Sequence, residues 1–521
     1  MTHLCVPIFV SSLDQAKRDA LLATEHGADL VEYRIDTFTD EEPLWQLLNA
    51  SPKPFVLTCR ASSEGGQSTL TDEERVEVVR TPGIDRAHYV DLELETLKKV
   101  PPPNLGGETR LIASSHDFTG RPDRLYNILA EMTASPADVN KIVWTARTLR
   151  DNLEAFEILQ SRQKPTIALC MGEAGIISRV LAKKFGAFLT FASLAKGAET
   201  APGQVSIDDM KRVYRWDAIN PNTKVYGVVG SPVGHSMSPA LHNAAFEHVG
   251  HDGVYVPLLV NPGYESFKAF METFLAFAPL HLSGLSITIP HKANALRYLK
   301  EKGGTVDPLA ESIGALNTIV IDGASSLNPE PRTLNPLRGF STDYPAILDS
   351  ITAKLNITRE QLKDYRVAVL GAGGTGRTAV AALAHYGATV VVYNRSFERA
   401  QALADEFNGN TGKVVAARFE KLGDSCCQIY LNTTSIGMAP NADASPTDGL
   451  DVRFTPDHLV FDAIYNPMRT KLLQIAHAAG AKTIGGVEMF VRQAAGQFEA
   501  WTNKNAPTEV MRQVVENRLK P

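Results

Sequence analysis

The stretch from Arg366 to Arg395 constrains the fold of this chain more than any other segment. It contains an apolar run, a glycine-rich turn, an alanine-rich segment and a second apolar run, which predicts strand, turn, helix and strand. Gly371, Gly373 and Gly376 form the pattern G-x-G-x-x-G directly after the first strand. In this context the pattern is typical of a dinucleotide-binding unit, where glycines let the backbone and helix amides approach a pyrophosphate. A glycine-rich turn without a ligand is the alternative.

The end of the second strand indicates which dinucleotide binds. An NAD site carries Asp or Glu there, which accepts a hydrogen bond from the ribose 2′-hydroxyl. This chain instead has Asn394, Arg395 and Ser396. A guanidinium suits a 2′-phosphate, so NADP is the predicted cofactor. Arg399 could share or replace this role, and a surface arginine without a ligand is the alternative for Arg395.

Length and composition exclude several classes of protein. A chain of 521 residues is too long for one core, which predicts several domains. The formal net charge of -6 disfavours nucleic acid as a partner. The chain has no apolar run of membrane-spanning length and no secretory signal after Met1, so we expect no membrane partner. The five cysteines have no metal-ligand spacing, which indicates no metal site and a reducing compartment, most simply the cytoplasm.

Eight short apolar runs alternate with helical patterns in the first part of the chain. Strands that alternate with helices eight times favour an α/β fold of the (β/α)₈ TIM-barrel type over an open sheet. The runs cover residues 6–10, 30–36, 55–60, 89–95, 111–117, 141–147, 167–172 and 189–193.

Several charged side chains are predicted to point into this barrel. Successive side chains of a strand face opposite sides, and the apolar residues of these runs are expected to face the helices. Buried charges cost several kcal/mol unless they are paired, so their presence predicts a polar ligand, with a self-satisfied ionic cluster as the alternative. The inward positions are Glu32, Arg34, Asp36, Asp91 and Glu93.

Further polar residues gather at the predicted strand ends, where the active sites of barrels lie. Lys141 differs from them because it opens its strand. A long lysine side chain that points inward could still reach the site, whereas position alone favours a surface lysine. The residues at strand ends are Arg60, Glu64, His116, Asp117, Arg147 and Arg179.

Six motifs make the first half resemble the type I 3-dehydroquinate dehydratases. The resemblance implies that Lys141 forms a Schiff base with the C3 ketone of dehydroquinate. It also implies that His116 removes a C2 proton and assists loss of the C1 hydroxyl. The motifs are EYRID at 32–36, TCRASSEGG at 58–66, SSHDF at 114–118, the strand with Lys141, CMGEAGIISR at 170–179 and APGQ at 201–204.

The same resemblance implies a set of substrate contacts. Arg179 would hold the substrate carboxylate, with Thr200 and Gln204 closing over it from a late loop. Family members commonly carry Ser at the position of Thr200, and the hydroxyl is retained here. The residues implied to bind hydroxyls and to orient the lysine and histidine are Glu32, Arg34, Arg60 and Glu64.

A turn-rich joint around 217–224 precedes a strand, a loop and a helix. Ser238 and Pro239 are suited to the N-cap and the first position of that helix. Ser236, just before them, adds a hydroxyl that a cap does not require. Hydroxyls and amides at a helix start can bind a carboxylate, so we expect an anion contact at Ser236 and Ser238.

Three polar residues stand at the ends of later apolar runs. Lys292, Asn317 and Asp343 are ordinary loop residues when taken singly. As a set they fit a Lys–Asp pair at an alcohol-to-ketone centre.

From about Lys224 to the end, the chain resembles the shikimate dehydrogenases. Besides the features above, NTTSIGM at 432–438, DAIYNP at 462–467 and GGVEMFVRQAAGQFEAW at 485–501 carry this resemblance. Two departures are Ser286, where many members have Asn, and an insertion-like stretch at 324–338 that lengthens a hairpin.

This second resemblance implies roles for the residues of the second half. Ser236 and Ser238 would bind the substrate carboxylate, and Lys292 with Asp343 would move the proton. The remaining substrate contacts would be Thr288, Asn317, Asp343 and Gln493 at hydroxyls, with Tyr465 and Gly486 bordering the nicotinamide. The implied cofactor contacts are Gly371, Ala372, Gly373, Gly374, Gly376, Asn394, Arg395, Ser396, Thr433, Gly486 and Met489.

The whole chain therefore resembles the fused dehydratase and dehydrogenase enzymes known from plants. The predicted domains are a barrel at 1–218, a substrate-binding domain at 224–343 completed by helices at 487–521, and a Rossmann NADP-binding domain at 344–486. The resemblance implies that dehydroquinate is converted to dehydroshikimate and then, with NADPH, to shikimate. It also implies the cytoplasm as location, or the plastid stroma if a transit peptide has been removed.

Two alternatives remain. The dehydrogenase half could act on quinate with NAD, or the chain could be a non-catalytic sensor of quinate. A sensor should have lost catalytic groups, whereas Lys141, His116, Lys292 and Asp343 are all present. Each half has its own lysine and carboxylate contacts, which predicts two independent chemistries. The sequence does not predict an oligomeric state, and a monomer is consistent with it.

Overall fold

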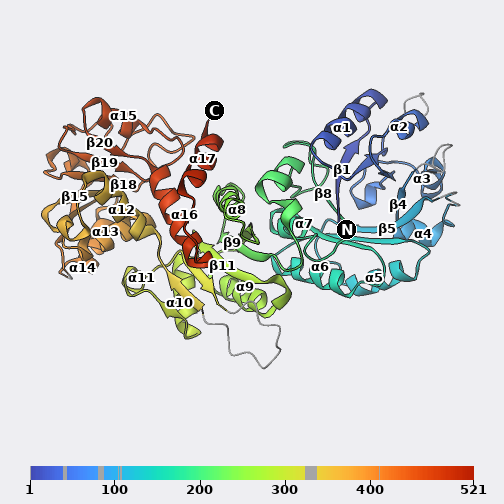
Figure 1. Ribbon diagram of the computed structural model, residues 1–521, viewed down its shortest axis with the longest axis horizontal. Helices are drawn as coiled ribbons and strands as arrows, with labels where there is room; N and C mark the ends of the chain where they lie inside the picture. The colour runs from blue at the N-terminus through green and yellow to red at the C-terminus, as the bar shows by residue number, and fades with distance from the viewer. Residues whose placement is uncertain are drawn as a thin grey trace. The chain divides into compact units, whose positions relative to one another are not determined.

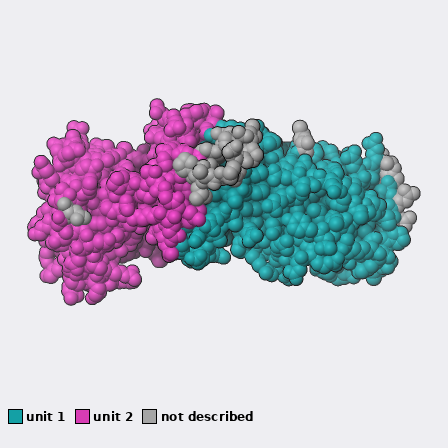
Figure 2. Space-filling view, turned by 90° about the horizontal axis from the view of Figure 1, so that it is seen from below, with its two compact units in different colours: residues 1–243, 252–282 teal, residues 244–251, 283–521 magenta. Residues whose placement is uncertain are grey.

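The computed structural model describes residues 2–38, 44–79, 87–103, 105, 108–322, 337–409 and 411–520. The chain divides into two compact units, coloured separately in Figure 2. Unit 1 contains Met1–Asn243 and Asp252–Leu282, and unit 2 contains Ala244–His251 and Ser283–Pro521. The boundaries expected at 218, 343 and 486 stay predictions. Most of the insertion-like stretch at 324–338 lies outside the described residues.

Eight parallel strands form a barrel in unit 1, in the order β1 to β8 around the sheet. β8 pairs with β1, and the Phe188 amide donates to the Thr166 carbonyl at 2.8 Å on the side of β7. All eight predicted strands are present, so the TIM-barrel prediction is confirmed. They are β1 His3–Phe9, β2 Leu30–Arg34, β3 Phe55–Thr58, β4 Tyr89–Glu93, β5 Arg110–Asp117, β6 Val139–Thr145, β7 Thr166–Met171 and β8 Leu189–Phe191.

Helices surround the barrel strands in Figure 1. The first of them, α1, begins after Ser12, whose hydroxyl accepts the Gln15 amide as an N-cap. It buries Leu13, Ala16, Ala20 and Ala23, which recur every three or four residues along one face. The helices are α1 Leu13–Glu25, α2 Trp45–Asn49, α3 Asp72–Val78, α4 Leu94–Lys99, α5 Leu125–Ala134, α6 Arg150–Ser161 and α7 Ile176–Val180.

Apolar side chains fill the barrel interior near the beginnings of the strands. Val56, Ile112, Val139 and Ile167 belong to this buried cluster. Branched apolar residues are the usual filling of such a barrel, whose active site lies at the opposite, carboxyl ends of the strands. Since apolar side chains fill the end of the barrel where the strands begin, the charged residues lie toward the carboxyl ends of the strands.

Unit 1 continues beyond the barrel. β9 Lys224–Gly230 and β10 Gly253–Leu259 pair in parallel, and α9 Tyr264–Ala276 follows them. Helix α8 Ser238–His248 connects the two strands. The loop before α8 carries Ser236, so this part of the unit places the predicted carboxylate-binding hydroxyls.

Unit 2 begins with a mixed group of strands and helices. β13 Thr318–Ile321 pairs antiparallel with β11 Leu282–Ile287 and with β14 Leu337–Phe340, and β12 Thr305–Val306 runs parallel to β14. The helices of this part are α10 Lys292–Glu301, α11 Pro308–Ile313 and α12 Asp343–Leu355.

The rest of unit 2 is a doubly wound parallel sheet with strand order β17-β16-β15-β18-β19-β20. Its order reverses at β15, and such a switch point is where dinucleotides bind. The Rossmann prediction is confirmed. The strands are β15 Arg366–Leu370, β16 Thr389–Asn394, β17 Val414–Arg418, β18 Ile429–Asn432, β19 Leu459–Asp462 and β20 Lys482–Ile484.

Helices cover both faces of this sheet. Residues of α12, α13 Gly374–His385 and α14 Phe397–Phe407 share one buried cluster with alternate strand residues, and α15 Lys471–Ala478 packs with the others. α16 Gly486–Thr502 and α17 Thr508–Leu519 end the chain. Among the described residues, no helix is long and apolar enough to span a bilayer.

Candidate active sites

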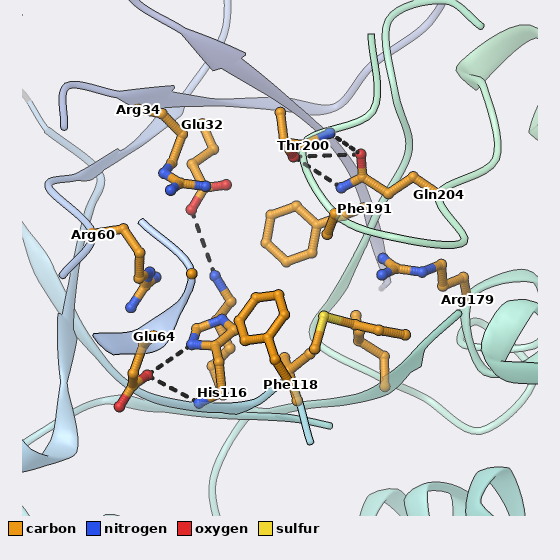
Figure 3. A pocket seen from close by; sticks show the side chains of 16 residues that line it. Glu32, Arg34, Arg60, Glu64, His116, Phe118, Arg179, Phe191, Thr200 and Gln204 are labelled. Carbon is orange, nitrogen blue, oxygen red and sulfur yellow. Dashed lines mark hydrogen bonds and ion pairs between the residues drawn. The ribbon is translucent and has the colours of Figure 1, made fainter. Parts of the chain in front are cut away.

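A pocket in the barrel brings together every substrate or catalytic residue predicted for the first half (Figure 3). The residues come from strands β2, β5 and β6, the segment after β3, helix α7 and the loop after β8. They are Glu32, Arg34, Arg60, Glu64, His116, Lys141, Arg179, Thr200 and Gln204.

Lys141 reaches this pocket from near the start of β6. It is only 4% exposed, so the alternative of a surface lysine is wrong. Its Nζ lies 2.8 Å from Asp91 Oδ2 and 3.5 Å from Glu32 Oε1. The ammonium also lies 4.6 Å from the centre of the Phe191 ring. The amine is therefore held at a defined point inside the barrel.

The other interior charges form a paired network. Arg60 contacts Asp91 at 2.7 Å and Glu93 at 3.1 Å, and it donates to the Ser114 hydroxyl at 2.6 Å. Burial alone would raise the pKa of Asp91, but the charges of Arg60 and Lys141 hold it well below its usual value. Arg75 contacts Glu93 from α3, and the sequence analysis did not identify it. This part of the interior is thus the self-satisfied ionic cluster considered as an alternative.

Arg34, the last residue of β2, forms an ion pair with Asp36 just after the strand. Its guanidinium donates to Asp36 at 2.6 Å, and its centre lies 4.8 Å from the centre of the Phe9 ring. Asp36 also accepts the backbone amides of Arg60 and Gln67, each at 3.0 Å. Asp36 therefore orients the segment that leads from β3 to Glu64.

His116 and Glu64 form a hydrogen-bonded pair. Glu64 Oε2 lies 2.9 Å from both the backbone nitrogen and Nδ1 of His116. Burial, with the charges of Arg60 and Lys141, lowers the pKa of His116 well below its usual value. Burial raises the pKa of Glu64 to about 7, although Arg60 opposes this shift. A neutral imidazole whose Nδ1–H donates to Glu64 leaves Nε2 able to accept a proton.

Arg179 is the exception among the buried charges. It is 1% exposed, and Nε has no hydrogen-bond partner within the described chain. Burial lowers the pKa of this guanidinium to about 10. Figure 3 shows the group directed into the pocket. An unpaired buried cation is costly, so the pocket is suited to an anionic ligand that pairs with it.

Thr200 and Gln204 lie in one loop and bond to each other. The Thr200 amide donates to Gln204 Oε1 at 2.8 Å, and Gln204 Nε2 donates to the Thr200 hydroxyl at 3.1 Å. The loop is attached to the end of β7, because the Gly172 amide donates to the Pro202 carbonyl at 3.1 Å. Both side chains are therefore presented to the pocket together.

Sequence reasoning missed the apolar part of the pocket lining. Phe118, Met171 and Phe191 contribute to it. Phe118 is 42% exposed and packs on Gly65, where an added Cβ would lie 2.1 Å from the ring. An aromatic residue in the otherwise polar segment after His116 was the available signal for it.

In unit 2, the first residues of two helices form the second reactive pair. Lys292 begins α10 and Asp343 begins α12, and Nζ lies 2.5 Å from Oδ2. Asn317 donates to the other carboxylate oxygen of Asp343 at 2.8 Å and accepts the Thr342 amide at 2.8 Å. The structure therefore brings together the three polar residues that the sequence placed at the ends of apolar runs.

The remaining residues predicted for unit 2 have other contacts. Thr288 lies in the turn after β11, where its carbonyl accepts the His291 amide at 2.9 Å. Gln493 donates to the Phe490 carbonyl at 3.0 Å, and the Tyr465 ring stacks on Phe490 with centroids 5.1 Å apart. Within the part of the chain that the structure describes, no hydrogen bond joins Gln493 or Tyr465 to the Lys292–Asp343 pair.

Ser286, one of the two departures noted in the sequence, is bonded to Gln497 of helix α16. The Ser286 hydroxyl donates to Gln497 Oε1 at 2.8 Å. Gln497 Nε2 in turn donates to the Asn317 carbonyl at 3.1 Å. The buried Ser286 thus supports Asn317 through Gln497 of helix α16, a residue to which the sequence analysis assigned no role.

In unit 1, the two predicted carboxylate-binding serines lie at the start of α8. The helix begins at Ser238, and the Ser238 amide donates to the Ser236 hydroxyl at 3.3 Å. The prediction that Ser238 is the N-cap is therefore wrong by one residue, because Ser238 already belongs to the helix. The Ser236 amide donates to the Val233 carbonyl at 3.0 Å, which turns the loop back on itself.

The glycine-rich turn after β15 is shaped for a close approach. Gly371 has φ +107, and a Cβ on Gly376 would lie 2.1 Å from the Gly371 carbonyl oxygen, so both positions require glycine. A Cβ on Gly373 or Gly374 would meet nothing within 4 Å. The turn is therefore open on the side of the α13 amides, which fits a pyrophosphate. The Ala372 amide donates to Asn394 Oδ1 at 3.2 Å and ties this turn to the end of β16.

The other predicted cofactor residues border this crevice. The Thr433 hydroxyl donates to the Leu370 carbonyl at 2.8 Å, beside the strand-order reversal. Gly486 begins α16, where a Cβ would lie 2.4 Å from the Ile464 carbonyl oxygen. Met489 is buried one turn later in the same helix.

Arg395 is exposed immediately after β16, next to Ser396. Arg418 ends β17 in register with Asn394, and its guanidinium lies 5.2 Å from the centre of the Phe397 ring. The sequence analysis did not consider Arg418, because its proximity depends on the pairing of β16 with β17. The rim of the nucleotide site is thus basic, as a 2′-phosphate requires.

Models of four protein families match the chain in order. Type I 3-dehydroquinase matches residues 4–221, and the shikimate dehydrogenase substrate binding domain matches residues 228–319. Shikimate / quinate 5-dehydrogenase matches residues 353–429, and the shikimate 5′-dehydrogenase C-terminal domain matches residues 486–516.

Individual proteins show similarity over the whole chain or its second half. The bifunctional 3-dehydroquinate dehydratase/shikimate dehydrogenase, chloroplastic, of Arabidopsis thaliana is 37% identical over 529 residues, covering 98% of this chain and 84% of that protein. The shikimate dehydrogenase (NADP(+)) of Methanosarcina barkeri is 36% identical over 304 residues, covering 57% of this chain and 99% of that protein. The solved dehydroquinate dehydratase and shikimate dehydrogenase of S. pombe is 25% identical with a TM-score of 0.44, covering 99% and 98% of the two chains.

Proposed function

The chain belongs to the family of bifunctional 3-dehydroquinate dehydratase/shikimate dehydrogenases, and we propose from this membership that it catalyses both reactions. The first half acts as a lyase and converts 3-dehydroquinate to 3-dehydroshikimate. The second half acts as an oxidoreductase and reduces 3-dehydroshikimate to shikimate with NADPH. The small-molecule substrates of these two reactions are the partners of the protein.

The observation that carries the dehydratase proposal is the buried Arg179, whose Nε has no partner among the described residues, in the same pocket as Lys141. Every other interior cation there has a carboxylate partner, so Arg179 is available for the carboxylate of dehydroquinate. The Thr200 and Gln204 loop covers that end of the substrate. The ketone is then directed to Lys141 at the other end.

The chemistry follows from the groups around Lys141. Its deprotonated amine attacks the C3 ketone, and loss of water forms a Schiff base. Nε2 of His116 takes a C2 proton while Glu64 accepts Nδ1–H and stabilises the imidazolium. The electron pair moves into the iminium, and the resulting enamine expels the C1 hydroxyl, which receives the proton from His116. Water then hydrolyses the Schiff base and releases dehydroshikimate.

Borohydride trapping tests this assignment. Borohydride added with dehydroshikimate should fix one adduct on the peptide containing Lys141 and abolish dehydration only. Lys183 and Lys196 are the controls within the same half. An adduct on either of them instead of Lys141 would show that the Schiff base forms elsewhere.

The dehydrogenase proposal rests on the Lys292–Asp343 pair. NADPH, held by the glycine-rich turn and the basic rim near Arg395, supplies the hydride when bound. Lys292 gives its proton to the ketone oxygen, and Asp343 keeps the lysine oriented. Ser236 and Ser238 hold the substrate carboxylate, and Thr288, Asn317 and Gln493 hold hydroxyls. Tyr465, Gly486 and Met489 border the nicotinamide.

A second candidate is a dehydrogenase half that acts on quinate with NAD, since one matching family model includes quinate dehydrogenases. Arg395 at the position of the NAD-selective acid favours NADP. An assay with dehydroshikimate and with quinate, each with both cofactors, decides between them. A non-catalytic sensor is disfavoured because both reactive lysines keep their acidic partners. We propose the cytoplasm as its location, or the plastid stroma if a transit peptide has been removed.

A further inference from the structure

A contact within unit 1 joins the dehydratase barrel to the loop that carries Ser236. Glu173 begins the short 3₁₀ turn after β7, and its Oε1 accepts the backbone amide of Gly234 at 3.0 Å. Gly234 stands two residues before Ser236 in the loop between β9 and α8. The acceptor thus comes from one predicted catalytic half and the donor from the other.

Gly234 has no side chain, which lets the Glu173 carboxylate approach its backbone closely. A Cβ on Gly234 would lie 3.0 Å from Glu173 Oε1, which is closer than ordinary packing allows. A side chain there would therefore require the carboxylate to shift by a few tenths of an ångström. Glu173 is exposed and is not part of the barrel pocket, so neither the dehydratase chemistry nor the barrel core accounts for this contact.

The loop held by Glu173 leads directly to the hydroxyls at the start of α8. The Ser236 amide donates to the Val233 carbonyl, and the Ser236 hydroxyl accepts the Ser238 amide. These local bonds make 233–238 one turn, so fixing Gly234 also restricts Ser236 and Ser238. The neighbouring Gly172 amide donates to the Pro202 carbonyl, in the loop with Thr200 and Gln204.

We propose that Glu173, a residue of the dehydratase half, is a positioning residue for the carboxylate-binding loop of the dehydrogenase half. This inference rests on the proposed function, in which Ser236 and Ser238 bind the carboxylate of dehydroshikimate. Glu173 acts through the Gly234 amide and does not touch the substrate. The fusion of the two halves thereby supplies part of the order that dehydroshikimate binding requires.

The test measures dehydroshikimate reduction and dehydroquinate dehydration in full-length Glu173→Ala and Glu173→Gln. Loss of one hydrogen bond should raise KM for dehydroshikimate roughly two- to tenfold in Glu173→Ala while kcat stays within about twofold. Dehydration should be unchanged. Glu173→Gln should restore KM, because its amide oxygen accepts the same bond.

Glu199→Ala is the matched control. Glu199 is also an exposed carboxylate of the barrel half that accepts a backbone amide at 3.0 Å, but its donor is the nearby Gly197. The variant loses the same charge and should leave KM for dehydroshikimate unchanged. An equal rise in KM in Glu199→Ala would overturn the inference, since a general charge effect would then explain both.

Gly234→Ala examines the other side of the contact. Because its Cβ crowds the Glu173 carboxylate and weakens the same bond, the double variant with Glu173→Ala should lose less than the sum of the two single losses. Additive losses, or an unchanged KM in Glu173→Ala with an active wild type, would overturn this inference alone. A wild-type chain that does not reduce dehydroshikimate would overturn the proposed function and the inference with it.

Discussion

The contact between His116 and Glu64 makes dehydration sensitive to pH near neutrality. Burial raises the pKa of Glu64 to about 7, so this carboxyl becomes protonated as the pH falls through that value. A protonated Glu64 stabilises the imidazolium less well, and His116 becomes a weaker base. We therefore expect kcat/KM for dehydroquinate to fall below about pH 7.

Glu64→Gln is the variant that tests this dependence. Its amide oxygen can still accept a hydrogen bond but does not titrate, so the fall below pH 7 should disappear. Activity at pH 8 should drop about fivefold, because a neutral hydrogen bond is about 1 kcal/mol weaker than a charged one. A pH–rate profile in Glu64→Gln with the same acid limb as wild type would assign that limb to another group.

Removal of Arg395 should affect the binding of NADPH more than the binding of NADH. Arg395→Ala should weaken NADPH binding by about 1.5–3 kcal/mol, since a charge-assisted contact to the 2′-phosphate is lost. NADH binding should change much less. Titration of both cofactors into the variant measures this difference, with Arg399→Ala and Arg418→Ala for comparison. An equal loss for both cofactors would place the 2′-phosphate elsewhere.

The segment after α7 holds the joint between β8 and β9 through a buried lysine. The Lys184 ammonium donates to the carbonyls of Pro221 and Thr223 at 2.7 and 2.9 Å and lies 3.1 Å from His281 Nδ1. Burial lowers its pKa to about 8. Three acceptors satisfy its three protons. This side chain therefore ties the joint between β8 and β9 to His281, which lies between α9 and β11.

Lys184→Met should destabilise unit 1 by roughly 1–3 kcal/mol, because the Pro221 carbonyl and the buried Thr223 carbonyl lose their donor. Thermal unfolding followed by calorimetry measures the shift. Lys183→Met is the control, since Lys183 also donates to two carbonyls but is only half-buried, and its effect should be smaller. Similar shifts in both variants would contradict a special role for Lys184.

The same lysine gives a pH dependence of defined sign. Between about pH 8 and 10.5 the unfolded state binds more protons at this residue than the folded state does. The free energy of unfolding of wild type relative to Lys184→Met should therefore rise with pH across this window. A falling difference would show that burial does not dominate the pKa of Lys184.

For the whole molecule, the structure is consistent with two separate reactive centres in one chain. Lys141 and Lys292 each have their own acidic partner, and no catalytic group is common to the two sets. Lys141→Ala should abolish dehydration and leave dehydroshikimate reduction near wild type. Lys292→Ala should lower reduction by at least roughly 10²-fold and leave dehydration near wild type.

Mixing these two full-length variants tests whether the intermediate passes through solution. An equimolar mixture with dehydroquinate and NADPH should form shikimate, with a lag while free dehydroshikimate accumulates. Wild type without a comparable lag would show that the fusion transfers its intermediate directly. Loss of both activities in either single variant would contradict the independence of the two centres.

Local sequence patterns were enough to predict the architecture, and the candidate reactive groups came from these patterns together with the family resemblance. Strand alternation, glycine spacing and local apolar patterns act over a few residues, so the eight barrel strands and the Rossmann turn at Gly371 could be predicted from them. Pleat alternation also predicted that Glu32 and Asp91 face inward. The family resemblance supplied Lys141, His116, Lys292 and Asp343.

Which of these groups are paired could be seen only in the folded chain. Arg60 is neutralised by β4, whereas Arg179 Nε has no partner among the described residues, and both facts depend on segments far apart in the sequence, as does the contact of Glu64 with His116. The bond from Gly234 to Glu173 and the burial of Lys184 have the same origin. Local patterns carry no information about such contacts, because packing between distant segments fixes both the distance of a charge from its neighbours and its access to water.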